Sequence, residues 1–239
     1  MSVSFVYVQL RSKPPILLMK FFRQLTCIAL FLGSTILASA QSSKLAPLRE
    51  AFAVCDVLDA ELRGKILHHL LEQDSTQVPL ELDLGVKLLS FSPQGLTLQT
   101  SEVGRWELRL LPLLGGNSLS AVIETVSAPQ TDARLSFFDK DGRPLQTRSP
   151  LLTLPEAKDF IGSMKLSSTW ACGRLRELLY PLHYEMSWQV GDEPILLVRP
   201  SVLLSEEDRQ STELIQLLTL LPTLTYRWTG SAFSLSAIK

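Results

Sequence analysis

The stretch RWELRLL, residues 105–111, alternates apolar and charged side chains. Successive side chains of a β-strand point to opposite faces, so the apolar residues share one face and Arg105, Glu107 and Arg109 share the other. A strand with one buried and one solvated face is typical of an antiparallel sheet. We therefore expect residues 105–111 to be a strand whose charged face contacts water.

Similar short segments, rich in Leu, Val, Thr and Phe, lie on both sides of this stretch. Turn-forming sequences separate them, among them SPQG at 92–95 and DKDG at 139–142. Such sequences favour tight turns between paired strands. We predict strands over 86–91, 95–100, 105–111, 118–126, 134–138, 184–190, 195–199, 224–228 and 233–235.

Two longer segments are predicted to be helices. Apolar residues recur every three or four positions over 48–71, as in an amphipathic helix, with a break into two helices as an alternative at 56–59. The other begins at Ser205, whose hydroxyl and the three acidic residues that follow suit the positive end of a helix. Shorter helices are expected after Pro155 and over 174–180. The prediction is an α+β fold, a single domain over 41–239 with a largely antiparallel β-sheet packed with an N-terminal helix and a C-terminal helix.

The first forty residues have the composition of a secretory signal peptide. They hold four basic residues and no acidic one, an apolar stretch over 25–38, and small residues before the expected cleavage site between Ala40 and Gln41. A retained N-terminal anchor is the alternative. Met19 begins an n-region of ordinary length, so residues 1–18 could reflect a misassigned start. We expect export to the periplasm, the cell surface or the medium.

The charge balance narrows the range of partners. The whole chain has 23 Lys and Arg against 24 Asp and Glu, and loss of residues 1–40 leaves 19 against 24. A protein that neutralises phosphates needs a basic surplus, so we expect no nucleic-acid partner. The apolar stretch is shorter than the roughly 20 residues of a membrane span, so no span is expected after cleavage. The partner is unknown, and an envelope protein is one candidate.

Two cysteines, Cys55 and Cys172, remain after cleavage. In an oxidising compartment they could form a disulfide. The alternative is that both are buried thiols, because a reduced cysteine behaves as a small apolar side chain.

The motifs of known metal and cofactor sites are absent from the sequence. His68 and His69 are adjacent, so on a helix their side chains point about 100° apart and cannot chelate one ion together. We expect both to lie on a solvated helix flank. The DKDG turn has Pro150, not a carboxylate, at the twelfth position of a calcium loop. No nucleophile elbow or phosphate-binding loop occurs. We predict no catalytic set, no metal site and no cofactor.

Two weaker hypotheses concern particular side chains. Cys172, with Arg174 nearby, could work with His183 as the reactive pair of an enzyme. The four tryptophans could form a ligand platform, although core packing is the more economical interpretation. Arg227, next to Trp228, would then lie on the wetter face of its strand, and we expect a ligand face around Arg227 and Trp228.

Several motifs follow one another in a set order: LRLLP at 108–112, VIETV at 122–126, PQTDA at 129–133, SEEDR at 205–209 and LTYRW at 224–228. This order resembles that of a family of exported Bacteroidales proteins with a domain of unknown function. The family has a Met-Pro-Asp-Ser-like element in its first helix, of which only Asp56 is present here. The resemblance implies export from a Gram-negative anaerobe and implies no reaction, cofactor or partner.

These observations lead to one main hypothesis about function. We expect an exported, non-enzymatic binding or assembly protein of the periplasm or cell surface, because the titratable residues are scattered along the sequence. The alternatives are an enzyme whose site is assembled from distant residues such as Cys172 and His183, and a carrier of apolar ligands built from the leucine-rich strands.

Overall fold

The fold was analysed in a computed structural model, which describes residues 44–72, 78–145, 150–162, 164 and 169–238. Residues 45–239 form one compact unit. The predicted signal peptide and its cleavage site at Ala40 and Gln41 lie outside the described residues.

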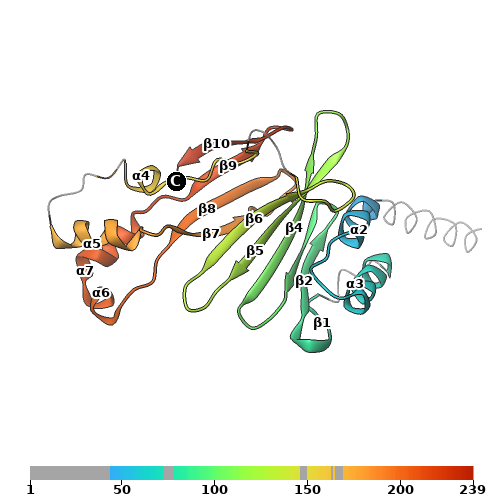
Figure 1. The fold of residues 1–239 in the computed structure, drawn as a ribbon, viewed down its shortest axis with the longest axis horizontal. Helices are drawn as coiled ribbons and strands as arrows, with labels where there is room; N and C mark the ends of the chain where they lie inside the picture. Colours follow the sequence, from blue (N-terminus) through green and yellow to red (C-terminus); the bar gives the residue numbers. More distant parts are fainter. Residues whose placement is uncertain (1–43, 73–77, 146–149, 163, 165–168, 239) are drawn as a thin grey trace, which may run out of the picture. The chain divides into compact units, whose positions relative to one another are not determined.

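Six strands form an antiparallel sheet in which each strand pairs with the next one along the chain (Figure 1). The turn at 139–142 closes as its composition predicts, because the Asp139 carboxylate accepts hydrogen bonds from the backbone N–H groups of Asp141 and Arg143, both at 2.9 Å. The strands are β1 (Leu80–Glu81), β2 (Lys87–Ser92), β3 (Gly95–Gln99), β4 (Gly104–Pro112), β5 (Ser118–Val126) and β6 (Asp132–Phe138), with a short 3-10 helix, η2 (Asp83–Gly85), between β1 and β2.

The remaining strands form a separate four-stranded antiparallel sheet in the order β10-β9-β8-β7. Every strand predicted from the sequence is present, but the strands are divided between two sheets. This sheet comprises β7 (His183–Trp188), β8 (Ile195–Ser201), β9 (Leu224–Trp228) and β10 (Phe233–Ile238).

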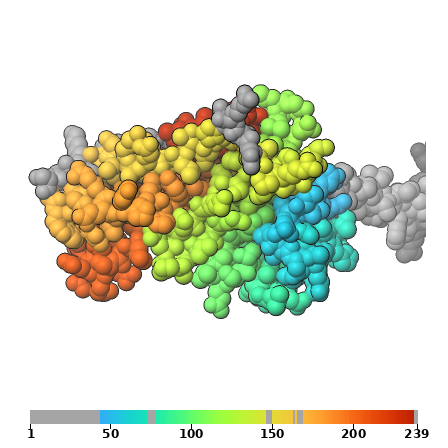
Figure 2. Space-filling model, viewed as in Figure 1, coloured from blue at the N-terminus to red at the C-terminus, as the bar shows by residue number. Residues whose placement is uncertain are grey.

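Two helices, α2 (Ala46–Ala53) and α3 (Ala60–Glu72), cover one face of the six-stranded sheet. The chain breaks between them, at the position that the sequence offered as an alternative, and the Asp59 carboxylate accepts from the backbone N–H of Leu62 at 2.8 Å. Phe52 is fully buried and meets the edge of Trp106, with ring centroids 6.1 Å apart. Figure 2 shows the side chains of α2 and α3, in blue and cyan, against the green strands of this sheet.

A second core lies on the opposite face of the same sheet, where the four-stranded sheet packs. It joins Leu111 and Ile123 of the first sheet to Leu196 and Val198 of the second. The Trp228 indole N–H, from β9, donates to the carbonyl of Pro112 at 2.6 Å. The six-stranded sheet is therefore covered on both faces along part of its width.

This second core overturns one expectation about the stretch at 105–111. Glu107 and Arg109 do not contact bulk solvent, as their exposed fractions are 5% and 7%. They lie on the face of β4 that the hairpin between β7 and β8 covers. The prediction of a solvated charged face is wrong for these two side chains, whereas Arg105 is exposed.

Three of the other helices, α4 (Ala157–Ile161), α5 (Trp170–Leu178) and α7 (Thr212–Thr219), contribute to the second core. The predicted C-terminal helix is present but divided at Ser211, whose hydroxyl accepts from the backbone N–H of Leu214 at 3.3 Å and begins a new helix. The predicted N-cap at Ser205 accepts from the Asp208 N–H at 3.1 Å, and the Asp208 carboxylate accepts from the Ser205 N–H at 3.0 Å. The helix that Ser205 caps is α6 (Glu206–Gln210).

The predicted fold class is confirmed: antiparallel sheets packed with N-terminal and C-terminal helices form an α+β domain. None of the helices in the described part of the chain has the length and apolar character that crossing a bilayer requires.

Candidate functional site

A polar cleft of about 410 Å³ lies where strands β2–β4 meet the hairpin between β7 and β8. Trp188 forms part of its wall. Four aliphatic or aromatic residues also line it, Phe91, Leu96, Leu108 and Val190, and the hydroxyl, amide and charged side chains are Ser90, Ser92, Gln94, Thr97, Arg105, Glu107, Arg109, Gln189 and Asp192. We call this the polar cleft.

The strand register explains why these side chains meet. Thr97 of β3 lies directly between Ser90 of β2 and Glu107 of β4, so the three form one row across the sheet. In the next row Arg109 lies opposite Gly95. A Cβ atom on Gly95 would be 2.2 Å from the carbonyl oxygen of Leu108, so only glycine allows β3 and β4 to approach this closely.

Glu107 is held from two sides. Its carboxylate lies 3.1 Å from Nε of Arg105 and accepts a hydrogen bond from the backbone N–H of Trp188. Burial raises the pKa of Glu107 above its usual value, because the desolvation of the charged form outweighs the attraction of Arg105 and the hydrogen bond. The cleft therefore holds a carboxyl group whose ionised form is disfavoured by burial.

Arg109 joins the β7–β8 hairpin to the six-stranded sheet. Its guanidinium donates to the carbonyl of Gly191 and to that of Glu193, the latter at 3.2 Å. Burial lowers the pKa of Arg109, and the charge of Asp192 opposes that shift. Within the described part of the chain, Nε of Arg109 has no hydrogen-bond partner. A buried donor without a partner is costly, so this atom calls for an explanation.

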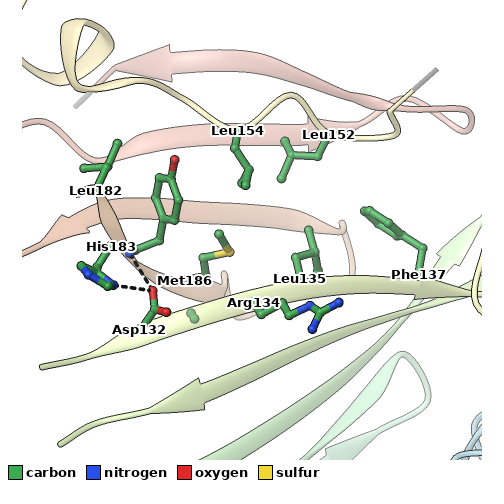
Figure 3. Close-up of a pocket in the computed structure, with 11 residues that line it drawn as sticks. Asp132, Arg134, Leu135, Phe137, Leu152, Leu154, Leu182, His183 and Met186 are labelled. Carbon is green, nitrogen blue, oxygen red and sulfur yellow. Dashed lines mark hydrogen bonds and ion pairs between the residues drawn. The ribbon is translucent and has the colours of Figure 1, made fainter. Parts of the chain in front are cut away.

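A second cavity, of about 500 Å³, lies between β6, β7 and residues 152–154 (Figure 3). At one end Asp132 and Nδ1 of His183 form an ion-pair contact of 3.3 Å. The Tyr184 hydroxyl donates to the carbonyl of Pro155 at 2.8 Å. Apolar side chains form most of this apolar pocket, namely Leu135, Phe137, Leu152, Leu154, Leu182 and Met186.

The Asp132–His183 contact has the geometry of a base and its orienting carboxylate. Nucleophilic catalysis also needs a nucleophile within reach of the base. The described residues that line the apolar pocket include no Ser, Cys, Thr or Lys. The arrangement is that of a pocket with one polar end, and its lining supplies no complete catalytic set.

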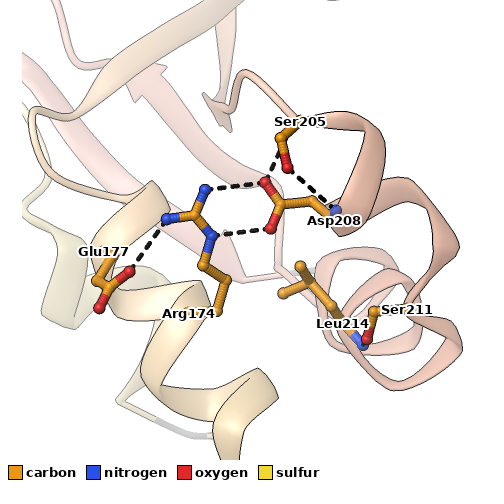
Figure 4. Close-up of polar contacts among 6 residues, drawn as sticks. All are labelled: Arg174, Glu177, Ser205, Asp208, Ser211 and Leu214. Atoms are coloured by element: carbon orange, nitrogen blue, oxygen red, sulfur yellow. Dashed lines mark hydrogen bonds and ion pairs between the residues drawn. The ribbon is translucent and has the colours of Figure 1, made fainter.

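A cluster of charged side chains joins α5 to α6 (Figure 4). Arg174 contacts both carboxylate oxygens of Asp208, at 2.8 and 2.9 Å, and also Glu177 at 3.0 Å. The Arg174 guanidinium holds the pKa of Asp208 well below its usual range. Each carboxylate oxygen of Asp208 is occupied by a protein partner, so this cluster links helices and offers no ligand site.

The two cysteines lie in different parts of the fold. Cys55 is in the core below α2, where its thiol donates to the carbonyl of Ala51 at 3.2 Å, and burial raises its pKa to about 11. Cys172 is buried on α5, next to Ala171 of the second core. No disulfide joins these two described residues.

The other candidate residues have different surroundings. His183 lies at the apolar pocket beside Asp132, whereas Cys172 is 2% exposed inside α5, so this placement gives no support to a joint catalytic role. Arg227 is exposed and lies 3.4 Å from Glu193, but Trp228 is buried and bonded to Pro112. A ligand face around Arg227 stays a prediction, without the Trp228 ring on its surface.

The adjacent histidines differ in environment. His68 is exposed and lies 3.5 Å from Glu72, whereas His69 is 7% exposed and packs edge-on against Phe91. The expectation that both lie on a solvated helix flank is wrong for His69. Among the residues that the structure describes, no group of three His, Cys, Asp or Glu side chains is placed to hold a metal ion.

These features define an α+β protein of two antiparallel sheets with ligand-sized cavities at their junction. The chain belongs to the DUF3256 family, described as proteins of unknown function, whose family profile matches residues 52–233. Its fold is similar to that of a domain of an uncharacterised protein from Porphyromonas gingivalis W83. The TM-score is 0.63 at 21% identity, over 80% of this chain and 98% of that one. No curated protein matches the chain.

Proposed function

We propose that this chain is an exported protein of a Bacteroidales bacterium that works in the periplasm or at the cell surface as a non-enzymatic binding or assembly protein. Its ligand site is the polar cleft. The composition of residues 1–40 supports export, since a basic segment, an apolar stretch and small residues follow one another as in a signal peptide.

The main evidence for a binding site in the polar cleft is that the Arg109 side chain is buried and incompletely hydrogen-bonded. This side chain is 7% exposed, lines the polar cleft, and has one donor atom without a partner among the described residues. Buried polar groups are almost always hydrogen-bonded, and the exceptions call for an explanation. Nε has almost no accessible surface, so a ligand would reach it only by a shift of the guanidinium, and a ligand that binds in this way provides one.

The charged side chains of the cleft are already bound to protein partners, and this favours a role in binding over one in catalysis. Arg109 holds two backbone carbonyls, and Glu107 holds a backbone N–H and the Arg105 guanidinium. Groups fixed in this way are pre-organised to orient a ligand. A general acid or base instead has to exchange a proton with its substrate.

Export is tested separately from binding. The full chain is produced in a Bacteroidales host, cells are fractionated, and the N-terminus of the protein is sequenced by mass spectrometry. We expect a protein outside the cytoplasm that begins at Gln41. A cytoplasmic protein with an intact leader would overturn the proposed location.

Binding is tested with residues 41–239 by thermal unfolding against a library of sugars, peptides, nucleotides and lipids. A ligand at 100 times its Kd stabilises a protein by about 2.7 kcal/mol, which is readily seen as a rise in Tm. We expect the rise to be lost in Thr97→Val, within the polar cleft, and kept in Ser234→Ala, on an exposed position of β10. Turnover of a substrate that a single substitution abolishes, or a library without any stabilising compound, contradicts a binding role.

The apolar pocket supports a second candidate, a carrier of apolar ligands. The carrying observation is a cavity of about 500 Å³ with six apolar side chains and one polar end, a combination that suits a ligand with an apolar body. Organic extraction of the purified protein followed by mass spectrometry would detect a co-purifying lipid. Its absence, together with a Tm that fatty acids do not change, would exclude this candidate.

A further inference from the structure

We infer that the polar cleft binds a neutral saccharide, an inference that rests on the proposed function and specifies its ligand. The argument uses the charge, the hydrogen-bonding groups and the position of the cleft on the sheet.

The formal charges of the cleft cancel. Arg105 and Arg109 line it together with Glu107 and Asp192, two positive against two negative side chains. A site selective for anions concentrates positive charge, and a site selective for cations concentrates negative charge. A balanced set discriminates against both and favours a ligand without net charge.

The hydrogen-bonding groups are both donors and acceptors. Ser90 and Thr97 provide hydroxyls that do either, and Gln94 and Gln189 provide amides with donor and acceptor groups. A ligand that satisfies such a set must itself both donate and accept at several neighbouring points. Sugar hydroxyls do this, because each can donate one hydrogen bond and accept others.

The spacing of these groups suits a compact ring. Ser90, Thr97 and Glu107 form one row across three neighbouring strands, which lie about 4.8 Å apart. Arg105 and Arg109 lie in the adjacent rows, about 7 Å away along β4. These rows of side chains therefore place hydrogen-bonding groups at separations similar to those between the substituents of one or two hexose rings.

Trp188 adds an apolar surface to these rows of polar side chains. It lines the cleft, is half-buried, and its ring lies 6.1 Å from that of Phe233. An aromatic ring at a polar cleft suits a ligand that has an apolar C–H face and a hydroxylated rim, as a pyranose does.

A peptide fits this position less well. Extended peptides dock mainly by adding a strand to a free sheet edge through backbone hydrogen bonds. The cleft lies on the face of β2–β4. At the nearby edge strand β7, the N–H of Trp188 already donates to Glu107 and that of Tyr184 to Asp132, at 3.4 Å.

Isothermal titration calorimetry of residues 41–239 tests the inference with four probes: maltotriose, mannotriose, trigalacturonate and a neutral tripeptide. We expect a neutral trisaccharide to bind. Glu107→Gln and Thr97→Val should each weaken it about tenfold or more, the effect of losing one hydrogen bond to a buried partner. Ser234→Ala is the matched control and should bind as the wild type does. Circular dichroism and Tm measurements show whether each variant folds.

The outcomes separate the two proposals. Binding of trigalacturonate or the tripeptide alone, lost in Thr97→Val, overturns the saccharide inference and leaves a binding protein. Saccharide binding that Glu107→Gln and Thr97→Val leave unchanged, in folded variants, overturns the assignment to the polar cleft. Failure of all four probes overturns the saccharide inference, and the proposed function fails as well only when the wider library also gives no stabilising compound.

Discussion

Arg174 of α5 and Asp208 of α6 face each other through two parallel hydrogen bonds, from Nε to Oδ1 at 2.8 Å and from the guanidinium NH2 group to Oδ2 at 2.9 Å (Figure 4). The same carboxylate accepts from the backbone N–H of Ser205, whose hydroxyl caps α6. One aspartate therefore serves both as the capping-box partner of its own helix and as the link to a helix more than thirty positions earlier.

Asp208→Asn is expected to destabilise the protein at pH 7 and by less at pH 3. The pKa of Asp208 is lowered in the folded state, so the stability from the ionised group is fully present above the unfolded pKa of about 3.9 and is lost progressively as the pH falls from that value towards the folded pKa. Urea unfolding at pH 7 and at pH 3 measures the difference. Glu206→Gln, in an exposed pair, is the control and should have little effect. An Asp208→Asn effect of the same size at both pH values would show that the charge is not responsible.

Phe52→Ala is expected to lower the free energy of unfolding by roughly 3–5 kcal/mol. The ring is fully buried and packs against Trp106, so its removal leaves a cavity between α2 and the sheet. Leu71→Ala, at a position of α3 that is 50% exposed, should cost about 0.5 kcal/mol or less. Chemical denaturation measures both changes, and equal small losses would mean that α2 does not dock as described.

Gly95→Ala is expected to cost about 1–3 kcal/mol or more, because the new methyl group would overlap the Leu108 carbonyl and push β3 away from β4. Gly115→Ala is the matched control, since a Cβ there meets nothing within 4 Å. Because Arg109 lies opposite Gly95, the same change should also disturb the polar cleft. A Gly95→Ala protein as stable as Gly115→Ala would contradict the close approach of the two strands.

Glu107→Gln is expected to leave the protein at least as stable as the wild type at pH 7, while it weakens ligand binding. The folded pKa of Glu107 is raised, so its contribution to stability is present below the unfolded pKa of about 4.3 and is lost as the pH rises through the folded value. The wild type should therefore regain stability relative to the variant between pH 7 and pH 4. If Glu107→Gln is less stable than the wild type by the same amount at pH 7 and at pH 4, the interactions of Glu107 with Arg105 and Trp188 compensate fully for the burial of its carboxylate.

Local sequence determined most of the elements. The alternation of apolar and polar residues and the composition of the turns indicated the strands. Ser205 and the three acidic residues after it indicated the start of α6. The period of two along residues 105–111 showed that the two faces of β4 differ. It could not show that a hairpin from a distant part of the chain covers the charged face.

The polar cleft escaped prediction for the same reason. Arg109 bonds to the carbonyls of Gly191 and Glu193, 82 and 84 positions later in the chain, and backbone carbonyls carry no sequence signature. The available signal was the concentration of three charges on one face of a strand in the middle of the predicted sheet. Helical periodicity likewise indicated that the side chains of His68 and His69 point in different directions. Only the packing of Phe91 against His69 shows which of the two is buried.

The division of the molecule into two cores has a consequence for the order of folding. The core between the helices and the six-stranded sheet contains only residues 45–138, and each strand of that sheet pairs with its neighbour in sequence. Such local pairings form quickly, and a chain synthesised from its N-terminus can complete them first. The polar cleft closes only when the β7–β8 hairpin arrives, so the capacity to bind ligand should be the last property that the nascent chain acquires.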